Sequence, residues 1–478
     1  MASAARFAAV DLGASSGRVI LGSVSKDAIN YEEVHRFGNG PVSREDGLYW
    51  DIGLLKSNVM QGLSKLSKFE VTSIGVDAWA VDYGLIDRGG KLVGEPHHYR
   101  DERNMRGVKI VEAKVSVDEL YGQVGLQFLP FNSLYQLAVD HAEQSDLLNQ
   151  SDKALLIPDL FNFWLCGSKV TERTIASTTG LLDPKTKSWH RGLINTLDLQ
   201  ERLLCEVVSE GTILGSVNQE TVPVAGLNSS TKVVTVGSHD TASAFVAVPS
   251  TKPGSLIISS GTWSLLGVEL DEPVLSEAAQ KANFTNEGGV DGRVRFLKNV
   301  TGLWLLQESI REWRAAGKIH QIPKLIGQAS TLSRRSVIDV DHERLVSPGD
   351  MPKKIQEICR ETGQWVPETE AEIVRTVIDS LVQKYVAVIA ELETLTKNKI
   401  ERIHIVGGGS QNDLLNQLTA NATGLEVLAG PVEATAIGNL VVQARTAGAI
   451  SGSLEGLRTL IAKNFDIRSF KPIPRGEK

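Results

Sequence analysis

A short stretch near the middle of the chain combines residue types that can do acid–base chemistry. It is Val236-Gly237-Ser238-His239-Asp240-Thr241, and the β-branched run 233–236 leads into it. A strand followed by a tight turn, an acid and a helix start presents a carboxylate at the rim of an α/β sheet, where such folds bind ligands. The simpler alternative is that Asp240 or Ser238 only caps the helix. The pattern therefore predicts either a general base or a helix cap.

A glycine- and serine-containing turn joins two apolar segments at the start of the chain. Residues 7–10 and 18–24 have strand patterns, and Asp11-Leu12-Gly13-Ala14-Ser15-Ser16-Gly17 lies between them. This spacing predicts a β-hairpin, and an ordinary hairpin is one interpretation. The functional alternative is a phosphate-binding loop, because successive backbone N–H groups in such a turn form an anion-binding concavity. Asp11 could then hold magnesium. The spacing of a P-loop is absent.

The second half of the chain repeats this arrangement. Residues 255–258 and 262–268 have strand patterns, and Ser259-Ser260-Gly261 forms the turn between them. Two such hairpins with an acid between them suggest duplicated halves that each offer a phosphate loop. The evidence for duplication is this likeness of elements rather than extended identity.

Helical segments with one apolar face must position these loops. Residues 52–66 and 373–392 have the required spacing, and the second leads into the predicted strand 403–406. Gly407-Gly408-Gly409 then precedes the predicted helix 414–422. Three glycines remove every side chain where a ligand could lie against the backbone. The alternative is a flexible turn with Ser410 or Asn412 as the helix cap.

Three further segments carry polar or aromatic residues without a clear motif. Trp79 lies between Asp77 and Asp82 and could stack on a small polyol, although a tryptophan there favours the core. The pair His97-His98 is interpreted as surface rather than as a metal site, and residues 285–289 as a loop.

Composition limits the classes of function. The 478 residues exceed a single core and suffice for two or three domains. A formal net charge of −7 gives no electrostatic reason to expect nucleic acid or an anionic membrane as a partner. No apolar run has the length of a membrane span, Asp11 interrupts the apolar run at the N-terminus, and three scattered cysteines suggest neither disulfides nor zinc. We expect a cytoplasmic protein.

With these motifs in place, nearly the whole chain resembles the FGGY carbohydrate kinases of the actin-like ATPase superfamily. The longer motifs are most similar to those of the members that phosphorylate L-rhamnulose. They are Ala14-Ser15-Ser16-Gly17-Arg18, Phe128-Leu129-Pro130-Phe131-Asn132, Ser238-His239-Asp240-Thr241, Ser259-Ser260-Gly261-Thr262-Trp263-Ser264 and Gly302-Leu303-Trp304-Leu305-Leu306-Gln307.

The resemblance implies an α/β fold with two actin-like, ribonuclease H-like domains, 1–245 and 246–478, and a cleft between them for ATP and sugar. It also implies transfer of phosphate from ATP to L-rhamnulose, with magnesium at Asp11 and Asp240 as the base. ATP contacts are implied for Ala14, Ser15, Ser16, Gly17, Arg18, Thr262, Gln307 and Gly408. Sugar contacts are implied for Ala80, His239, Asp240, Thr241 and Asn299.

One position departs from the family pattern, because the family usually has glycine where this chain has Ala80. A methyl group there could crowd the ketose, so L-fuculose, L-ribulose and D-xylulose stay open as alternative substrates. Two further classes are a non-catalytic actin-like ATPase and a sugar sensor. The resemblance leaves open a monomer or a homodimer.

Overall fold

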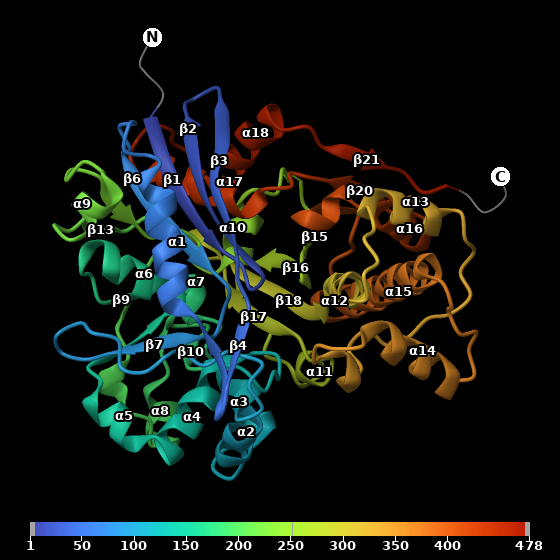
Figure 1. Cartoon of the computed structure of the whole chain (residues 1–478), viewed down its shortest axis with the longest axis horizontal. Coiled ribbons are helices and arrows are strands. Elements are labelled where there is room, and N and C mark those ends of the chain that lie inside the picture. The colour runs from blue at the N-terminus through green and yellow to red at the C-terminus, as the bar shows by residue number, and fades with distance from the viewer. Residues whose placement is uncertain (1–4, 251, 474–478) are drawn as a thin grey trace. The chain divides into compact units, whose positions relative to one another are not determined.

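The computed structural model describes residues 5–250 and 252–473. The chain forms two compact units, each assembled from separate segments (Figure 1). Unit 1 comprises Met1–Pro249, Glu269–Phe296 and Ala434–Asn464, and unit 2 comprises Ser250–Val268, Leu297–Glu433 and Phe465–Lys478.

The sheet of unit 1 contains the first predicted hairpin. Strands β1 and β2 pair antiparallel from Ala5↔Val24 to Leu12↔Gly17, and β1 pairs on its other side with β6 in parallel. Because β1 is paired on both edges and covered on both faces, residues 7–10 are completely buried. The strand order is β13(Ile213–Ser216), β14(Lys232–Val234), β6(Ser73–Ala78), β1(Ala5–Leu12), β2(Ser16–Val24) and β3(Ile29–Gly38).

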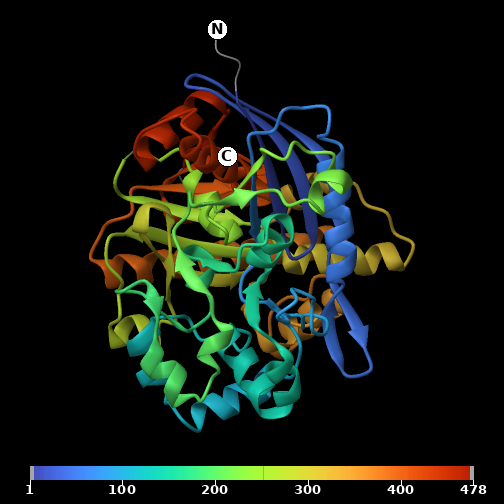
Figure 2. The same ribbon diagram turned by 90° about the vertical axis from the view of Figure 1, so that its left-hand side faces the viewer.

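Two helices cover opposite faces of this sheet. Helix α1(Ile52–Ser64), which was predicted as 52–66, has Asp51 as its N-cap and approaches β2 where Gly62 meets Val19. Helix α17(Ala434–Thr446) approaches the same strand where Leu440 meets Gly22. Residues 19 and 22 point to opposite sides of an extended strand, so the two helices lie on opposite faces. Figures 1 and 2 show β1, β2 and β3 side by side, with α1 running along them.

The rest of unit 1 is built mainly from short helices. Helix α10(Asp240–Val246) follows β14 after a short turn, as predicted, and packs against α17. The other helices are α2(Asn104–Glu112), α3(Val117–Val124), α4(Ser133–Glu143), α5(Ser145–Gln150), α6(Ile157–Cys166), α7(Arg173–Ala176), α8(Arg191–Thr196), η1(Glu201–Leu203), α9(Thr221–Ala225), α11(Glu277–Lys281), η2(Val290–Gly292) and α18(Leu454–Asn464). The remaining short strands are β4(Pro41–Arg44), β5(Gly47–Trp50), β7(Tyr83–Ile86), β8(Lys153–Leu156), β9(Val170–Glu172), β10(Leu182–Asp183), β11(Ser188–Trp189) and β12(Glu206–Val208).

The second sheet contains the second predicted hairpin. Strands β15 and β16 pair antiparallel up to Ser260↔Ser264, and β15 pairs in parallel with β19. The strand order is β17(Thr285–Gly288), β18(Val294–Thr301), β16(Trp263–Leu270), β15(Ser255–Ser260), β19(Arg402–Val406), β20(Glu426–Ala429) and β21(Arg468–Phe470). Residues 285–288 are thus a strand, and the prediction of a loop there was wrong because a Thr-Asn-Glu-Gly segment has little apolar character to reveal its pairing.

The long helix of unit 2 confirms the clearest periodic pattern of the sequence. Helix α15(Glu370–Thr396) begins with a capping box between Thr369 and Glu372, and its apolar face from Ile373 to Leu392 is buried. The other helices are α12(Trp304–Ala315), α13(Ile322–Ser330), η3(Glu343–Leu345), α14(Met351–Glu361), η4(Gly408–Gln411) and α16(Asp413–Thr423). None of the helices formed by the described residues is both long and apolar enough to cross a membrane.

Candidate active site

Three segments of unit 1 lie side by side at one sheet edge: the carboxyl ends of β1 and β6 and the stretch 238–240. Asp11 and Asp77 are register neighbours on these two parallel strands. The backbone N–H of Ala78 donates to the carbonyl oxygen of Ser238 at 2.9 Å, and that of Trp79 donates to Leu12 at 2.9 Å. This sheet edge therefore brings Asp11 and Asp77 close to the stretch that carries Asp240, as the strand–turn–helix pattern predicts.

The carboxylates at this edge perturb one another. Burial and the nearby charge of Asp11 raise the pKa of Asp77, while the Nδ2 amide of Asn439, which donates to Asp77 Oδ2 at 2.6 Å, opposes the rise. Burial also raises the pKa of Asp240, although 29 % of its side chain remains exposed, and His239 opposes that rise. A carboxylate that is both reachable and more basic than usual suits proton abstraction.

Asp240 is the first residue of α10 rather than its cap. The N-cap position belongs to His239, whose side chain makes no capping hydrogen bond. The carboxylate of Asp240 instead accepts hydrogen bonds from its neighbour, at 2.5 Å from the backbone N–H of Thr241 and at 3.1 Å from its hydroxyl. The alternative in which Asp240 or Ser238 occupies the cap position is therefore not what the structure shows.

The turn before Asp240 is held by a buried glutamate. Oε2 of Glu172, at the end of β9, accepts hydrogen bonds from the N–H groups of Thr174 at 2.9 Å and Ser238 at 3.2 Å. The hydroxyl of Thr174 in turn accepts the N–H of His239 at 3.2 Å, so β9 and α7 fix the start of α10. Burial, with a smaller contribution from the charge of Glu210, raises the pKa of Glu172 to about 7. No sequence motif revealed this residue.

The first glycine-rich turn is short and tied to β3. The backbone N–H of Gly13 donates to the carbonyl oxygen of Ser16 at 2.9 Å. The side-chain amide of Asn39 donates to the carbonyl oxygen of Gly13 at 2.8 Å. A Cβ on Gly17 would lie 2.3 Å from the ring of Phe37, so a larger residue there would require this ring to move. Arg18 donates to Asp11 at 2.6 Å, which joins two of the predicted site residues. Of the other predicted contacts, Ala14 and Ser16 are half-buried and Ser15 is exposed.

Ala80 follows a buried aromatic cluster. Trp79 donates from its indole to Asp82 Oδ2 at 3.0 Å and stacks near Trp50, so it belongs to the core, as expected, and not to an open sugar platform. Ala80 itself is half-buried and packs against the apolar core of unit 1. The expectation that His97 and His98 are surface residues was wrong for His98, which is buried between aromatic rings. Burial lowers the pKa of His98 to about 3.

The second glycine-rich turn is backed by residues before α12. Gly261 donates to the carbonyl oxygen of Trp263 at 2.8 Å, and Gly302 donates to that of Thr262 at 3.1 Å. A Cβ on Gly302 would lie 2.5 Å from the backbone of Trp263, which explains the glycine. The Thr262 hydroxyl donates to Oε1 of Gln307 at 3.2 Å, so two predicted ATP contacts lie together in unit 2. Asn299 is half-buried on β18.

The triple glycine lies between β19 and α16, as predicted. Gly407 has a positive φ of 80°, and a Cβ on Gly409 would lie 2.0 Å from Oγ of Ser260. Gly408, by contrast, would meet nothing within 4 Å. Asn412 caps α16 by accepting from Leu415 at 3.1 Å, so the predicted helix cap is confirmed. The cap accounts for Asn412 and does not involve Gly408.

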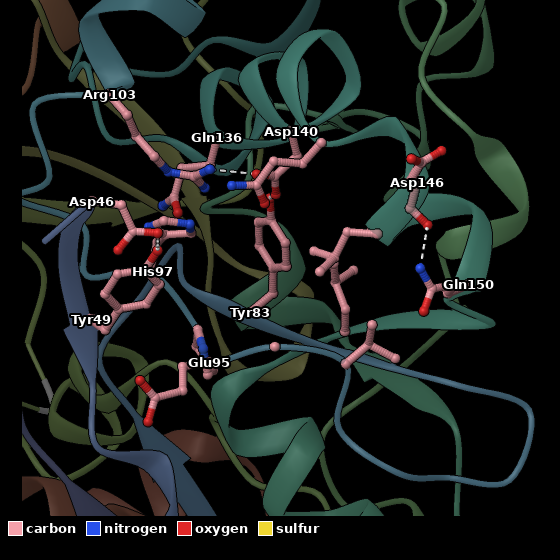
Figure 3. A pocket seen from close by; sticks show the side chains of 16 residues that line it. Asp46, Tyr49, Tyr83, Glu95, His97, Arg103, Gln136, Asp140, Asp146 and Gln150 are labelled. Atoms are coloured by element: carbon pink, nitrogen blue, oxygen red, sulfur yellow. Dashed lines mark hydrogen bonds and ion pairs between the residues drawn. The ribbon is translucent and has the colours of Figure 1, made fainter. Parts of the chain in front are cut away.

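A cavity of about 440 Å³ opens elsewhere in unit 1 (Figure 3). Its polar lining includes the ion pair of Arg103 with Asp140, to which the Tyr83 hydroxyl also donates at 2.5 Å. None of the predicted site residues lines this cavity. Within residues 5–250 and 252–473, no group of three or more histidine, cysteine, aspartate or glutamate side chains is arranged to hold a metal ion.

Comparisons with known proteins identify the family of the chain. The N-terminal domain model of the FGGY family of carbohydrate kinases matches residues 7–247, and the C-terminal domain model matches residues 256–447. Rhamnulokinase of Bacteroides thetaiotaomicron is 40 % identical over 98 % of this chain and 96 % of its own length. Rhamnulokinase of Bacillus subtilis is 38 % identical over 98 % of this chain and 95 % of its own.

Solved structures show the same fold at lower identity. The ligand-bound xylulose kinase of Lactobacillus acidophilus has a TM-score of 0.79 and 16 % identity, over 98 % of this chain and 94 % of its own. Plasmodium falciparum glycerol kinase with ADP has a TM-score of 0.77 and 14 % identity, over 98 % of this chain and 94 % of its own. The predicted α/β fold with two domains of this kind is confirmed, and the chain belongs to the FGGY family of carbohydrate kinases.

Proposed function

We propose that the protein transfers the γ-phosphoryl group of ATP to the C1 hydroxyl of L-rhamnulose, giving ADP and L-rhamnulose 1-phosphate in the breakdown of L-rhamnose. The observation that carries this proposal is the identity of about 40 % to rhamnulokinases over nearly the entire chain. A family alone would leave the sugar open, because one fold serves many substrates.

Asp240 is the base in this mechanism. As the C1 oxygen forms its bond to the γ-phosphorus, the O–H bond breaks, the proton passes to the carboxylate of Asp240, and the bond to ADP breaks. The raised pKa of Asp240 supports this role, because a stronger base accepts the proton more readily. Phosphoryl transfer otherwise requires positioning and charge stabilisation from the protein.

The phosphates of ATP contact loops from both halves of the chain. Residues 14–18 supply the first loop from the proposed domain 1–245. The proposed domain 246–478 supplies Thr262, Gln307 and the open backbone at Gly408.

Magnesium fits the residues at the end of β1. Asp11 offers hard carboxylate oxygens, and its charge repels those of Asp77 and Asp240. Magnesium in kinases typically binds one or two carboxylates together with substrate phosphates. Asp11 would hold the ion, which would supply neutralisation of the phosphate charge. Asp11 is also bonded to Arg18, so the phosphate loop and the carboxylate are held as one group.

Ala80, His239, Thr241 and Asn299 contact the sugar in this proposal. Ala80 replaces the glycine that is usual in the family, and this departure is the one feature that favours another ketose. The alternative substrates are L-fuculose, L-ribulose and D-xylulose.

A ketose panel with ATP tests the substrate directly. ADP release is measured with each of the four ketoses, and we expect L-rhamnulose to have the highest kcat/KM. Preference for another ketose by about tenfold or more, a difference of about 1.4 kcal/mol, would overturn the rhamnulose assignment and leave a sugar kinase. The proposal places the enzyme in the cytoplasm, as a monomer or homodimer, with a small sugar rather than nucleic acid or membrane as its partner.

A further inference from the structure

His239 stands between the base and a buried ion pair. Its Nε2 lies 3.4 Å from Oδ1 of Asp240, on one side of the ring. On the other side, its Nδ1 lies 3.1 Å from Nη2 of Arg295 and 3.2 Å from Oε2 of Glu287. Nη2 of Arg295 lies 3.2 Å from Oε2 of Glu287, and the Arg295 side chain is fully buried.

The chemistry of these groups determines where the proton of His239 lies. A guanidinium has donors only, so the contact of Arg295 with Nδ1 is a hydrogen bond only when Nδ1 is unprotonated. A neutral ring then carries its proton on Nε2, which faces Asp240. The opposite arrangement, with the proton on Nδ1 bonded to Glu287, would turn the Nε2 lone pair toward a carboxylate. A doubly protonated ring would face a carboxylate at each nitrogen, but its protonated Nδ1 would point at the donors of Arg295 only 3.1 Å away and lose that hydrogen bond. The first arrangement is therefore favoured.

This arrangement distinguishes the two oxygens of the base. Thr241 donates to Oδ1 of Asp240 from both its backbone N–H and its hydroxyl, and Nε2 of His239 faces the same oxygen. The two hydrogen bonds from Thr241 hold the carboxylate at Oδ1, with Nε2 of His239 3.4 Å from the same oxygen, and this leaves Oδ2 for the incoming proton of the substrate.

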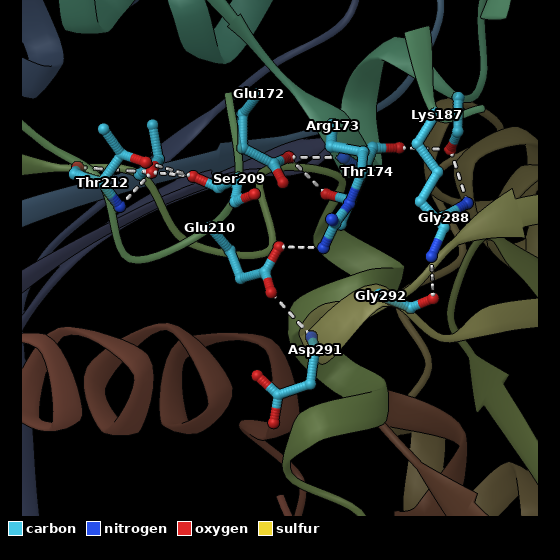
Figure 4. A network of polar contacts seen from close by, with 12 residues as sticks. Glu172, Arg173, Thr174, Lys187, Ser209, Glu210, Thr212, Gly288, Asp291 and Gly292 are labelled. Carbon is cyan, nitrogen blue, oxygen red and sulfur yellow. Dashed lines mark hydrogen bonds and ion pairs between the residues drawn. The ribbon is translucent and has the colours of Figure 1, made fainter. Parts of the chain in front are cut away.

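The ion pair is held rigidly by its surroundings. Arg295 Nε donates to the carbonyl oxygen of Gly288 at 2.8 Å, and the N–H of Gly288 donates to Ser177 at 2.7 Å. The turn between the two charged residues is held by Glu210, which accepts the N–H of Asp291 at 2.6 Å, and by Lys187, which donates to Gly292 at 2.9 Å (Figure 4). A fixed donor is what a defined tautomer requires.

We propose that Arg295 and Glu287 are positioning residues for the reaction: Arg295, held by Glu287, donates to Nδ1 of His239, keeps the ring proton on Nε2 and thereby orients Asp240 so that Oδ2 receives the proton of the sugar hydroxyl. This inference rests on the proposed function for the identity of the substrate. The tautomer itself is a property of the free protein.

The test is ¹⁵N NMR of the full chain labelled at histidine, with the signal of His239 assigned from its loss in His239→Gln. We expect a neutral ring protonated at Nε2 near pH 7.5. A ring protonated at Nδ1, or at both nitrogens, would overturn the proposal. The tautomer is measured in the unaltered protein without substrate, and the variant serves only to assign the signal, so the result does not depend on the identity of the ketose.

Kinetics of a matched pair of variants tests the consequence. Arg295→Met removes the donor but keeps a long side chain. The control is Arg293→Met, which removes an arginine just before the same strand, β18, that forms ion pairs with Glu455 and Glu269 instead. Arg295→Met should lower kcat at least about tenfold, within the range of general-base assistance, with KM for ATP changed less than about twofold.

In Arg295→Met the His239 tautomer should also change, whereas Arg293→Met should leave both the tautomer and kcat unaltered. An unchanged tautomer in folded Arg295→Met would refute the role of Arg295. If the tautomer behaves as expected but none of the four ketoses is phosphorylated, the proposed function fails while the assignment of the ring proton stands.

Discussion

A single methyl group at Gly438 should displace Asp240, the proposed base, without touching it. Gly438 lies in α17 at the point where this helix approaches α10, the helix that begins with Asp240. A Cβ at this position would lie 1.9 Å from the carbonyl oxygen of Ser243 and 2.7 Å from its carbonyl carbon. Both atoms belong to backbone, so no change of rotamer can relieve the clash.

The magnitude of the Gly438→Ala effect follows from these distances. A carbon and a carbonyl oxygen normally approach to about 3.3 Å, so the two helices must separate by more than about 1 Å. Overpacking of a core typically costs about 1–3 kcal/mol, and a clash of backbone with a rigid helix lies at the upper end. The better helix propensity of alanine offsets about 1 kcal/mol. We expect a net loss of about 2 kcal/mol, or about 4 °C in Tm. A shift of about 1 Å at Asp240 can lower kcat about a hundredfold.

Thermal unfolding and steady-state kinetics of Gly438→Ala measure both effects. Gly456→Ala is the matched control, because Gly456 also lies within a helix, α18, but a Cβ there meets nothing within 4 Å. This control should keep its kcat and gain up to about 1 kcal/mol of stability. If Gly438→Ala kept the Tm and more than about half of the kcat of the wild type, the close packing of α10 and α17 would not position the base.

Three further predictions address other parts of the site. Because burial raises the pKa of Glu172 to about 7, this group binds its proton more tightly in the folded protein than in the unfolded chain, and its contribution to stability falls as pH rises from about 4.5 to 7. The Tm of Glu172→Gln, measured against wild type from pH 5 to 8, should therefore improve relative to wild type at the higher pH, and a constant difference would contradict a raised pKa. Gly408→Ala should leave the Tm unchanged but raise the KM for ATP about tenfold or more, because its methyl group would extend into open space where ATP is proposed to lie, and an unchanged KM would exclude this contact. Ala80→Gly should change kcat/KM for L-rhamnulose less than about tenfold if Ala80 makes only a backbone contact, whereas a larger change would show that its methyl group selects the sugar.

The parts of the fold that could be predicted are those governed by local periodicity. The two glycine-turn hairpins and the helix α15 follow from apolar residues at fixed spacing, and each is present. The position of Asp240 after a strand and a turn was also predictable. The hydrogen bond that Asp240 accepts from Thr241 and the N-cap position of His239 were not, because both depend on local backbone geometry.

The contacts that support the site are long-range and left little trace in the sequence. Glu172 lies more than sixty residues before the turn it holds, and nothing in its neighbourhood indicates that role. Arg295 offered a signal that could have been used, because a charged residue flanked by Val294 and Phe296 in an apolar strand implies a buried partner. The return of residues 434–464 to unit 1 depends on packing of α17 against β1, which no local pattern specifies.

The most direct test of the proposed mechanism is the kcat of Asp240→Asn. Asparagine keeps the size and one acceptor oxygen but cannot take the proton, and general-base assistance is typically worth about 10²–10⁴ in rate. Because both proposed phosphate loops stay intact, we predict that kcat falls at least about a hundredfold while the Kd for ATP changes less than about tenfold. Under a purely structural role at the start of α10, asparagine would serve as well as aspartate. A variant that retained more than about a tenth of the wild-type kcat would contradict the assignment of Asp240 as the base.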